Sequence, residues 1–226
     1  MSLVKIWDKK IKGKLWVVGD IHGCHTLLMN TLKEKNFDFD NDLLVSVGDL
    51  IDRGYENIKC VELLSNKWFT SVRGNHEDLC INGLSDESYK RCHISNGGEW
   101  FYMLDCQAMY NIAKTFAGLP VVLEISHNGR KFGFVHGHIE QNDWNEFKDS
   151  FKHENSQRPP SELAMWGRER LNPENKKYTH VNGVDAVFMG HSIVNQVCKR
   201  DNCYYIDVGS CFYGRLAVIC LDDLWK

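Results

Sequence analysis

The chain has 226 residues, of which 43% are hydrophobic, so it can form one sizeable domain with a substantial core. Its 27 basic and 30 acidic residues give a formal charge of −3, which excludes a general electrostatic attraction for nucleic acid or an anionic membrane. No apolar run approaches the ~20 residues of a membrane span and no signal-peptide core is found, so we expect a cytoplasmic protein.

The first half of the chain alternates apolar runs with stretches of helical periodicity. Buried strands are predicted at 15–19, 43–47 and 68–72. Helices are predicted between them, at 26–35 and 56–64, with core positions at Leu27, Leu28, Leu32, Ile58, Val61, Leu63 and Leu64. This order implies parallel strands joined by right-handed crossovers. Residues 97–119 are predicted to be mainly helical, with Trp100, Phe101, Met103 and Leu104 in the core, and Pro120 ends that stretch.

The second half is predicted to be mainly antiparallel. Asn128-Gly129 suits the positive φ angles of a tight turn between strands at 121–126 and 131–136. Further strands are predicted at 184–190, 194–199, 203–208 and 215–221. A parallel half followed by an antiparallel half suggests two sheets packed face to face with helices outside. Between these strands, residues 138–182 are long, polar and irregular, which is typical of a functional lid or an insertion.

The nine cysteines are predicted to be reduced. They form no C-x-x-C pair, and their number is odd in a chain without a secretion signal. Cys198 and Cys203 flank a predicted turn and could face each other across a hairpin. Such a position would permit oxidation without requiring it.

Five predicted strands end in residues that can bind metal ions. The motifs are Gly19-Asp20-Ile21-His22-Gly23, Gly48-Asp49-Leu50-Ile51-Asp52-Arg53-Gly54, Arg73-Gly74-Asn75-His76-Glu77, Val135-His136-Gly137-His138 and Met189-Gly190-His191. Any one of them alone is more often a simple turn. Side chains that follow strand C-termini converge on one rim of an α/β sheet, so five motifs of this kind predict an active site at that rim.

The expected metal ligands combine carboxylate, amide and imidazole groups. They are Asp20, His22, Asp49, Asn75, His136 and His191. Asp20 and His22 lie two residues apart and can chelate one cation, whereas the Asp49 carboxylate can bridge two. This set lacks thiolates and suits Mn²⁺, Fe²⁺ or Zn²⁺ at a catalytic site. Two such ions could acidify a bridging water and hold phosphate oxygens for in-line attack.

His76 is the expected general acid, because it directly follows the ligand Asn75 and is not itself required as a ligand. Asp52 is expected to hold the His76 imidazole and stabilise its protonated form. Arg53, Arg168 and Asn75 are expected to contact phosphate, with Arg168 reaching it from the 138–182 insertion. The remaining histidines are expected at the surface or behind the site: His25, His93, His127, His138, His153 and His180.

These motifs resemble those of the phosphoprotein phosphatase family of metallophosphoesterases, in particular the phage lambda type and its bacterial relatives. The resemblance covers nearly the whole chain and includes Asn96-Gly97-Gly98-x-Trp100-Phe101, Trp166-x-Arg168-x-Arg170 and Tyr205-Ile206-Asp207-x-Gly209. It implies an α/β, calcineurin-like metallophosphoesterase fold, in which two mixed β-sheets form a sandwich flanked by helices. It also implies a single catalytic domain over residues 1–226, with the insertion at about 138–182 lining the substrate cleft.

The resemblance implies a metal-dependent serine/threonine protein phosphatase, with phosphotyrosine as a further substrate. A hydroxide bridging two divalent ions, Mn²⁺ in preference to Fe or Zn, would attack, and His76 would protonate the leaving group. Phosphoproteins or phosphopeptides are the expected partners, with no nucleic acid, membrane or obligate partner. One alternative is a symmetrical dinucleoside tetraphosphate hydrolase, but such enzymes typically lack the equivalent of Asp52. A second is a non-catalytic scaffold, which should have lost His76 or several ligands.

Overall fold

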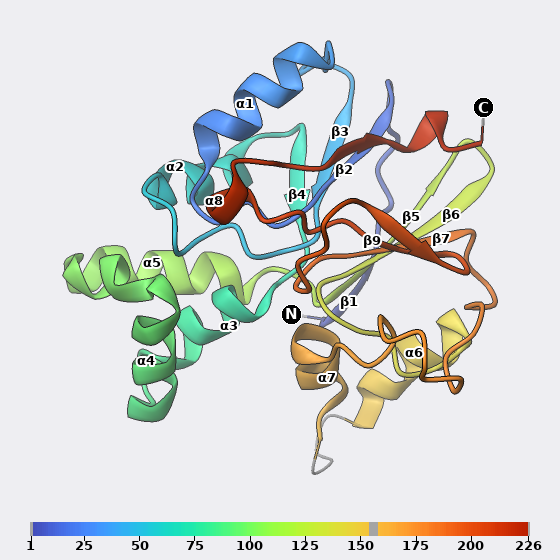
Figure 1. Cartoon of the computed structure of the whole chain (residues 1–226). Helices are drawn as coiled ribbons and strands as arrows, with labels where there is room; N and C mark the ends of the chain where they lie inside the picture. The colour runs from blue at the N-terminus through green and yellow to red at the C-terminus, as the bar shows by residue number, and fades with distance from the viewer. Residues whose placement is uncertain (1, 154–157, 226) are drawn as a thin grey trace.

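The computed structural model of the protein describes residues 2–153 and 158–225. Two β-sheets face each other, and helices cover the outer face of each (Figure 1). In the first sheet, three parallel strands follow one another, and a fourth, from the C-terminal end, runs antiparallel to the first of them: β2 (Leu15–Val18), β3 (Leu43–Ser46), β4 (Phe69–Ser71) and β10 (Val218–Cys220). The predicted α/β sandwich is therefore confirmed.

The second sheet has the order β1-β5-β6-β7-β9-β8 and contains both parallel and antiparallel pairs. Its strands are β1 (Val4–Ile6), β5 (Val122–His127), β6 (Arg130–Val135), β7 (Ala186–Met189), β8 (Cys198–Arg200) and β9 (Cys203–Tyr205). The prediction of a mainly antiparallel second half was wrong, because β1–β5, β6–β7 and β7–β9 are parallel. The long segment between β6 and β7 makes the crossover that a parallel pair requires.

Eight α-helices are present in the described residues: α1 (His25–Glu34), α2 (Asn57–Glu62), α3 (Asn75–Asn82), α4 (Glu87–His93), α5 (Cys106–Ala117), α6 (Trp144–Ser150), α7 (Pro160–Trp166) and α8 (Ser210–Tyr213). Helices α6 and α7 lie in the segment predicted to be irregular, so that part of the prediction was wrong. Each has only seven residues, too few for a clear helical period. The Asp143 side chain caps α6, and Pro160 begins α7.

Apolar residues fill three layers. Val17, Val45 and Phe134 pack between the sheets, Leu28 and Phe116 pack under the helices of the first sheet, and another group lies between the second sheet and helices α6 and α7. Leu32 and Leu63 are buried as predicted, Val61 and Leu64 are partly buried, and Leu27 is half-buried. The predictions for Ile58 and Met103 were wrong, since 43% and 81% of these residues are exposed. Helix α2 has under two turns, so one face of it remains outside the core.

Two predicted turns have different outcomes. Asn128 and Gly129 adopt φ angles of 49° and 74° between β5 and β6, as the sequence predicts. The β8–β9 hairpin also forms, but Cys198 lies opposite Tyr205, and Cys203 lies opposite Arg200. The two cysteines therefore do not face each other, and all nine cysteines are free thiols. The strand predicted at 194–199 begins only at Cys198.

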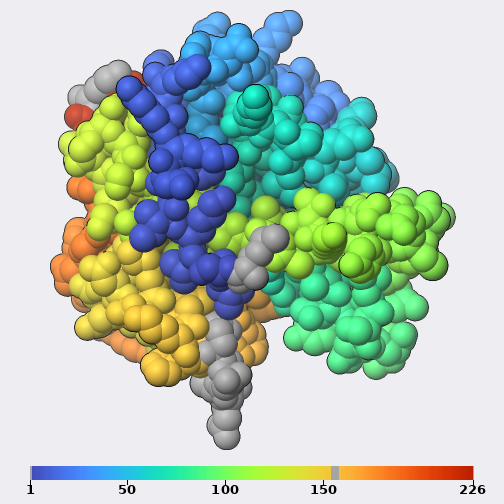
Figure 2. Space-filling view, turned by 180° about the vertical axis from the view of Figure 1, so that it is seen from behind, coloured from blue at the N-terminus to red at the C-terminus, as the bar shows by residue number. Residues whose placement is uncertain are grey.

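The N-terminal segment crosses the back of the molecule before it enters the first sheet (Figure 2). On its way it forms β1, which pairs in parallel with β5 and was not predicted. In the described part of the chain, no helix combines the length and apolar character needed to cross a membrane.

Candidate active site

The Asp49 carboxylate lies at the centre of the strand-end motifs. Its Oδ2 atom is 3.2 Å from His136 Nε2, 3.7 Å from His22 Nε2 and 3.9 Å from His76 Nε2. His22, Asp49 and His136 lie in loops that follow β2, β3 and β6, and His76 lies in the first turn of α3, which follows β4. All are buried, so they meet where little water competes for their polar atoms.

Two groups of potential ligands share Asp49. One contains His22, Asp49 and His76, and the other contains Asp49, His136 and His191; within each group the ligand atoms lie within 4.8 Å of one another. The other expected ligands are at the same place. Asn75 Oδ1 is 2.9 Å from His136 Nε2, and Asp20 Oδ2 is 4.0 Å from His22 Nε2. The structure thus brings all six expected ligands together, and it places His76 beside them.

The backbone is strained at this site. Among the described residues, eight non-glycine residues have positive φ angles, and five of them belong to the motifs: His22, Asp49, Asp52, Arg53 and His191. L-residues adopt this region at a cost, and such strain concentrates at functional sites. Gly190 permits a close approach, since a Cβ atom there would lie 1.9 Å from Asp20 Oδ1. Glycine beside His191 therefore leaves room for the Asp20 carboxylate.

Backbone carbonyls fix which ring nitrogen each histidine presents to the site. His22 Nδ1 lies 2.9 Å from the Ile51 carbonyl, and His136 Nδ1 lies 2.8 Å from the Val47 carbonyl. A carbonyl only accepts, so both Nδ1 atoms carry the proton, and His22 Nε2 keeps a lone pair. His136 Nε2 instead faces Asp49 Oδ2 and Asn75 Oδ1; burial lowers the pKa of His136, but the Asp49 carboxylate outweighs burial and raises it. His191 is turned the other way, with Nε2 3.1 Å from the Trp166 carbonyl and Nδ1 left free. Such outer hydrogen bonds orient histidines that bind metal.

The charges of these residues fit divalent cations. Burial lowers the pKa of both His22 and His191 to about 3, so each is a neutral imidazole at pH 7. Burial raises the pKa of Asp49, but the imidazoles of His136 and His76 outweigh burial and hold that pKa well below its usual range. The pKa of Asp20 is raised well above its usual range by burial and by the nearby carboxylates of Asp207 and Asp49. Bound cations would relieve this repulsion.

Asp207 was not among the predicted site residues. It is buried, it accepts a hydrogen bond from the Gly209 amide at 2.9 Å, and its charge is felt by Asp20. The sequence signal was the Tyr205-Ile206-Asp207-x-Gly209 pattern, to which no role was attached.

His76 and Asp52 form a buried pair. His76 Nδ1 lies 2.6 Å from Asp52 Oδ2, and His76 Nε2 finds no hydrogen-bond partner among the residues that the structure describes. Nε2 points to the same centre as the ligand atoms, 3.9 Å from Asp49 Oδ2. The imidazole can therefore keep its Nδ1 proton in the hydrogen bond to Asp52 while Nε2 gives a proton to a bound molecule.

Asp52 also accepts hydrogen bonds from His93 Nε2 at 2.9 Å and from Trp100 Nε1 at 2.7 Å. His93 is fully buried and lies behind the site. Trp100 was predicted as core only, and this was incomplete, since its indole holds the second carboxylate oxygen. Burial raises the pKa of Asp52, but the hydrogen bonds from His76 and His93 outweigh it and lower that pKa. Asp52 is thus held ionised beside His76.

Glu77 is a second buried carboxylate that sequence reasoning did not assign, although it ends the Gly74-Asn75-His76-Glu77 motif. It accepts backbone N–H bonds from Asp49, Leu50 and Gly74 at 3.0, 2.8 and 2.8 Å. Burial and the nearby Asp49 raise its pKa to about 7. These contacts fasten the loop that carries Asp49 to the start of α3.

Both expected phosphate-binding arginines lie at the site. Arg53 Nη1 donates to His22 Nε2 at 2.7 Å, so the guanidinium must move away before His22 can bind a cation. Arg168 Nη1 donates to the His191 carbonyl at 2.9 Å and to Ser192 Oγ at 3.1 Å. Arg168 therefore reaches the rim of the centre from the insertion.

Comparison with known proteins identifies the family. The family model for calcineurin-like phosphoesterases matches residues 13–195. The chain belongs to this family. The phosphoesterase is 33% identical over 223 residues to serine/threonine-protein phosphatase 2 of Salmonella typhimurium, an alignment that covers 96% of this chain and 98% of the relative. It is also 35% identical to serine/threonine-protein phosphatase 1 of that organism, over 90% of each chain.

Other comparisons are weaker or shorter. A Saccharomyces cerevisiae serine/threonine phosphatase structure superposes with a TM-score of 0.60 at 18% identity, covering 91% of this chain and 70% of the other, and supports the fold alone. The symmetrical bis(5'-nucleosyl)-tetraphosphatase of Buchnera aphidicola is 38% identical over 84 residues, which is 36% of this chain and 30% of that protein. In sequence, the match to this tetraphosphatase is thus confined to part of the chain.

The stability of the phosphoesterase in EDTA should fall as the pH is lowered from about 6.5. His22 and His191 have folded pKa values of about 3, below the unfolded value of 6.5, so the unfolded chain binds more protons between these limits. Each of these two histidines should lower the free energy of unfolding by about 1 kcal/mol as the pH falls from 6.5 to 5.5. Urea unfolding across this range should show a shallower decline for His22→Asn than for wild type. An equally shallow decline in the His25→Asn control would contradict the assignment of the effect to His22.

Proposed function

We propose that this phosphoesterase is a metal-dependent serine/threonine protein phosphatase that also accepts phosphotyrosine. The observation that carries the proposal is the buried His76–Asp52 pair, 2.6 Å apart, with His76 Nε2 facing the ligand centre. A serine or threonine alkoxide is a strongly basic leaving group and needs a proton, whereas a nucleoside diphosphate leaves readily without one. Relatives named serine/threonine-protein phosphatases, similar along nearly their whole length, support the same conclusion.

Two divalent ions, Mn²⁺ in our proposal, would be held by Asp20, His22, Asp49, Asn75, His136 and His191, and Asp49 belongs to both groups of potential ligands. When bound, such ions acidify water and neutralise phosphate oxygens. The neutral imidazoles of His22 and His191 and the ionised Asp49 fit this donor set, and a bound cation would replace the proton that Asp49 favours on His136. The nine free thiols suit a reducing compartment, and we propose the cytoplasm. The proposed partners are phosphoproteins or phosphopeptides, with no nucleic acid or membrane involved.

The remaining residues bind the phosphate and move the proton. Arg53 and Arg168 carry planar guanidinium groups that match phosphate oxygens and would orient the phosphoryl group for in-line attack. His76 would donate the Nε2 proton to the departing oxygen. Asp52 would hold Nδ1–H and stabilise the protonated imidazole, and His93 and Trp100 would keep Asp52 in place.

The decisive experiment is a side-by-side turnover assay with Mn²⁺ on a phosphoserine peptide, a phosphotyrosine peptide and diadenosine tetraphosphate. We expect the highest kcat/KM with the phosphoserine peptide and none with EDTA present. A higher kcat/KM for the dinucleotide would favour the nucleotide hydrolase alternative. Absence of turnover on all three would favour the scaffold alternative.

Arg168→Ala should lower kcat/KM on phosphopeptides and on aryl phosphates. Losing one guanidinium that binds phosphate costs on the order of 1.5–3 kcal/mol of transition-state binding, which lowers kcat/KM by about 10–150-fold. Arg168→Lys keeps the charge but not the planar guanidinium, so its kcat/KM should lie between those of wild type and Arg168→Ala. Lys152→Ala, an exposed cation of the same insertion, is the matched control and should not change turnover. Unchanged kcat/KM in Arg168→Ala would show that the insertion is peripheral to the chemistry.

A further inference from the structure

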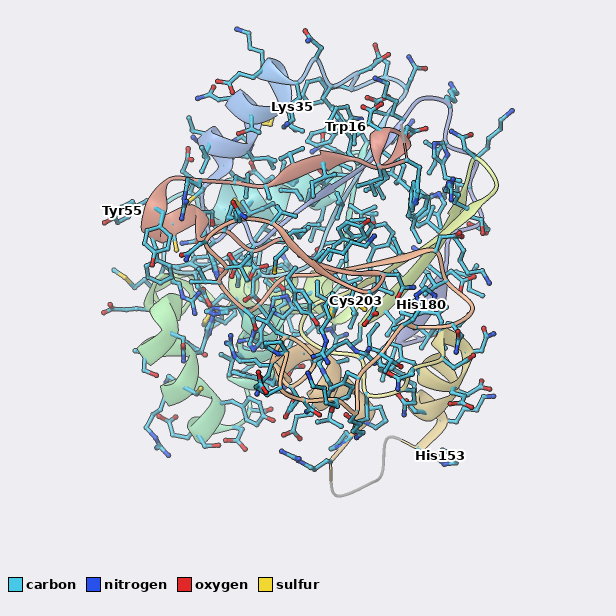
Figure 3. All side chains as sticks on the ribbon, turned by 45° about the vertical axis from the view of Figure 1, so that its right-hand side comes forward. Trp16, Lys35, Tyr55, His153, His180 and Cys203 are labelled. Carbon is cyan, nitrogen blue, oxygen red and sulfur yellow. The ribbon has the colours of Figure 1, made fainter. Side chains whose placement is uncertain are left out.

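A cavity of about 380 Å³ lies between the insertion and the edge of the second sheet, and the proposed mechanism does not use it. Its lining includes Leu171, Pro173, Lys176, Lys199, Arg200 and Tyr205. Small-molecule sites in proteins have volumes of roughly 300–1,000 Å³. In Figure 3, His180 of the insertion and Cys203 of β9 lie close together, and the Val181 amide donates to Asn202 Oδ1 at 2.9 Å. The insertion is thus fastened to the sheet beside the cavity.

The cavity wall carries positive charges without carboxylate partners. Within the described residues, Lys176 and Arg200 form no ion pair: Lys176 donates to the Pro173 carbonyl, and Arg200 donates to four backbone carbonyls. The Lys199 ammonium lies over the Tyr204 ring, on the opposite face of the β8–β9 hairpin from Arg200 and Tyr205, and does not face the cavity. Neutral acceptors satisfy the N–H groups of Arg200 but leave its charge uncompensated.

Arg170 adds to this positive field. It is 2% exposed, and it donates to the Ile139, Thr179 and Gln141 carbonyls and to Asn142 Oδ1. Glu140, the carboxylate bound to the Tyr178 hydroxyl, is already shared with Lys177 and His138. A buried guanidinium that contacts only neutral acceptors is costly and favours a nearby anion.

The Tyr205 hydroxyl provides an independent indication of a ligand. Tyr205 lines the cavity and is 1% exposed, yet its hydroxyl has no hydrogen-bond partner among the described residues. Buried hydroxyls without a partner are rare and destabilising. A donor of this kind, placed beside cations, would be satisfied by an anionic oxygen.

We propose that this cavity, formed by the insertion and strands β8 and β9, binds a small phosphate monoester or phosphonate with an apolar group. Tyr205 donates to one oxygen, and Lys176, Arg200 and the buried Arg170 offset the charge of the dianion. Leu171 and Pro173 contact the apolar group. Several cations around one head group suit a dianion better than a carboxylate.

Calorimetric titration with phenylphosphonate, in EDTA, tests the site on the full-length phosphoesterase. We expect saturable binding to wild type, at least about tenfold weaker in Tyr205→Phe and also weaker in the surface variant Lys176→Ala. Tyr204→Phe, the neighbouring tyrosine, and Arg168→Ala, at the catalytic centre, should bind as wild type does. Without the phosphonate, Tyr205→Phe should have an unchanged or higher Tm, since it removes an unpaired buried hydroxyl.

Wild-type affinity in both Tyr205→Phe and Lys176→Ala would overturn the proposal. So would loss of binding in Arg168→Ala alone, because the phosphonate would then occupy only the catalytic centre. Inorganic phosphate, which lacks the apolar group, should bind more weakly than phenylphosphonate. Equal affinity for benzoate would overturn the assignment of a phosphate head group.

Discussion

Asp49→Asn is expected to reduce turnover by on the order of 10³-fold or more and to leave less than the wild-type content of metal after dialysis. Asp49 belongs to both ligand groups, so the substitution removes negative charge from both at once. Without a tightly held Lewis acid, water does not ionise at neutral pH. The fold should survive, because asparagine tolerates the φ of 52° and its side-chain oxygen can still accept from the His76 amide, now 3.0 Å from Asp49 Oδ1.

Metal analysis and turnover should be measured on the same samples. Asp38→Asn, an exposed carboxylate in a turn, is the matched control and should keep both properties. Wild-type metal content together with wild-type turnover in Asp49→Asn would refute the shared-ligand assignment.

His76→Asn should slow the hydrolysis of a phosphoserine peptide by a larger factor than that of p-nitrophenyl phosphate. The serine alkoxide needs a proton as it leaves, whereas p-nitrophenolate leaves well unaided. General acid catalysis contributes ~10²–10⁴-fold, so the two factors should differ measurably. Asp52→Asn should give the same pattern more weakly, because it acts through the 2.6 Å hydrogen bond to His76.

The rates must be compared under conditions where the chemical step limits turnover. His180→Asn, at an exposed position of the insertion, controls for loss of an imidazole elsewhere. Equal slowing of both substrates by His76→Asn would exclude the general-acid role and would favour a role in binding phosphate.

Much of the site could be predicted because the residues that carry its chemistry lie in short sequence motifs. Glycine next to Asp or His at the end of an apolar run specifies both a tight turn and a polar side chain beyond the strand. The ends of parallel strands share one edge of a sheet, so Asp20, Asp49 and Asn75 could be expected to meet. The positive φ angles of His22, Asp49 and His191 show that these turns also hold strained backbone.

Other contacts could not be predicted, because they join residues that no local pattern connects. His93 and Trp100 reach Asp52 across 41 and 48 positions of the chain. Trp100 belongs to the Asn96-Gly97-Gly98-x-Trp100-Phe101 pattern, but nothing in that pattern indicates a contact with Asp52. Glu77 stands in a recognisable motif, but its three bonds to backbone amides depend on how the β3 loop folds onto α3. The sequence likewise could not predict that the Tyr205 hydroxyl is buried without a hydrogen-bond partner among the described residues.

The sequence by itself determined the α/β class, the two sheets, the Asn128-Gly129 hairpin and the residues expected at the metal centre. These properties depend on periodicity, turn conformation and side-chain chemistry, which act over a few residues. Only the tertiary structure decided that β7 runs parallel to β6, that short helices occupy the insertion and that Cys198 does not face Cys203. Strand direction, register and burial depend on contacts between distant segments, and these contacts form only when the whole core packs.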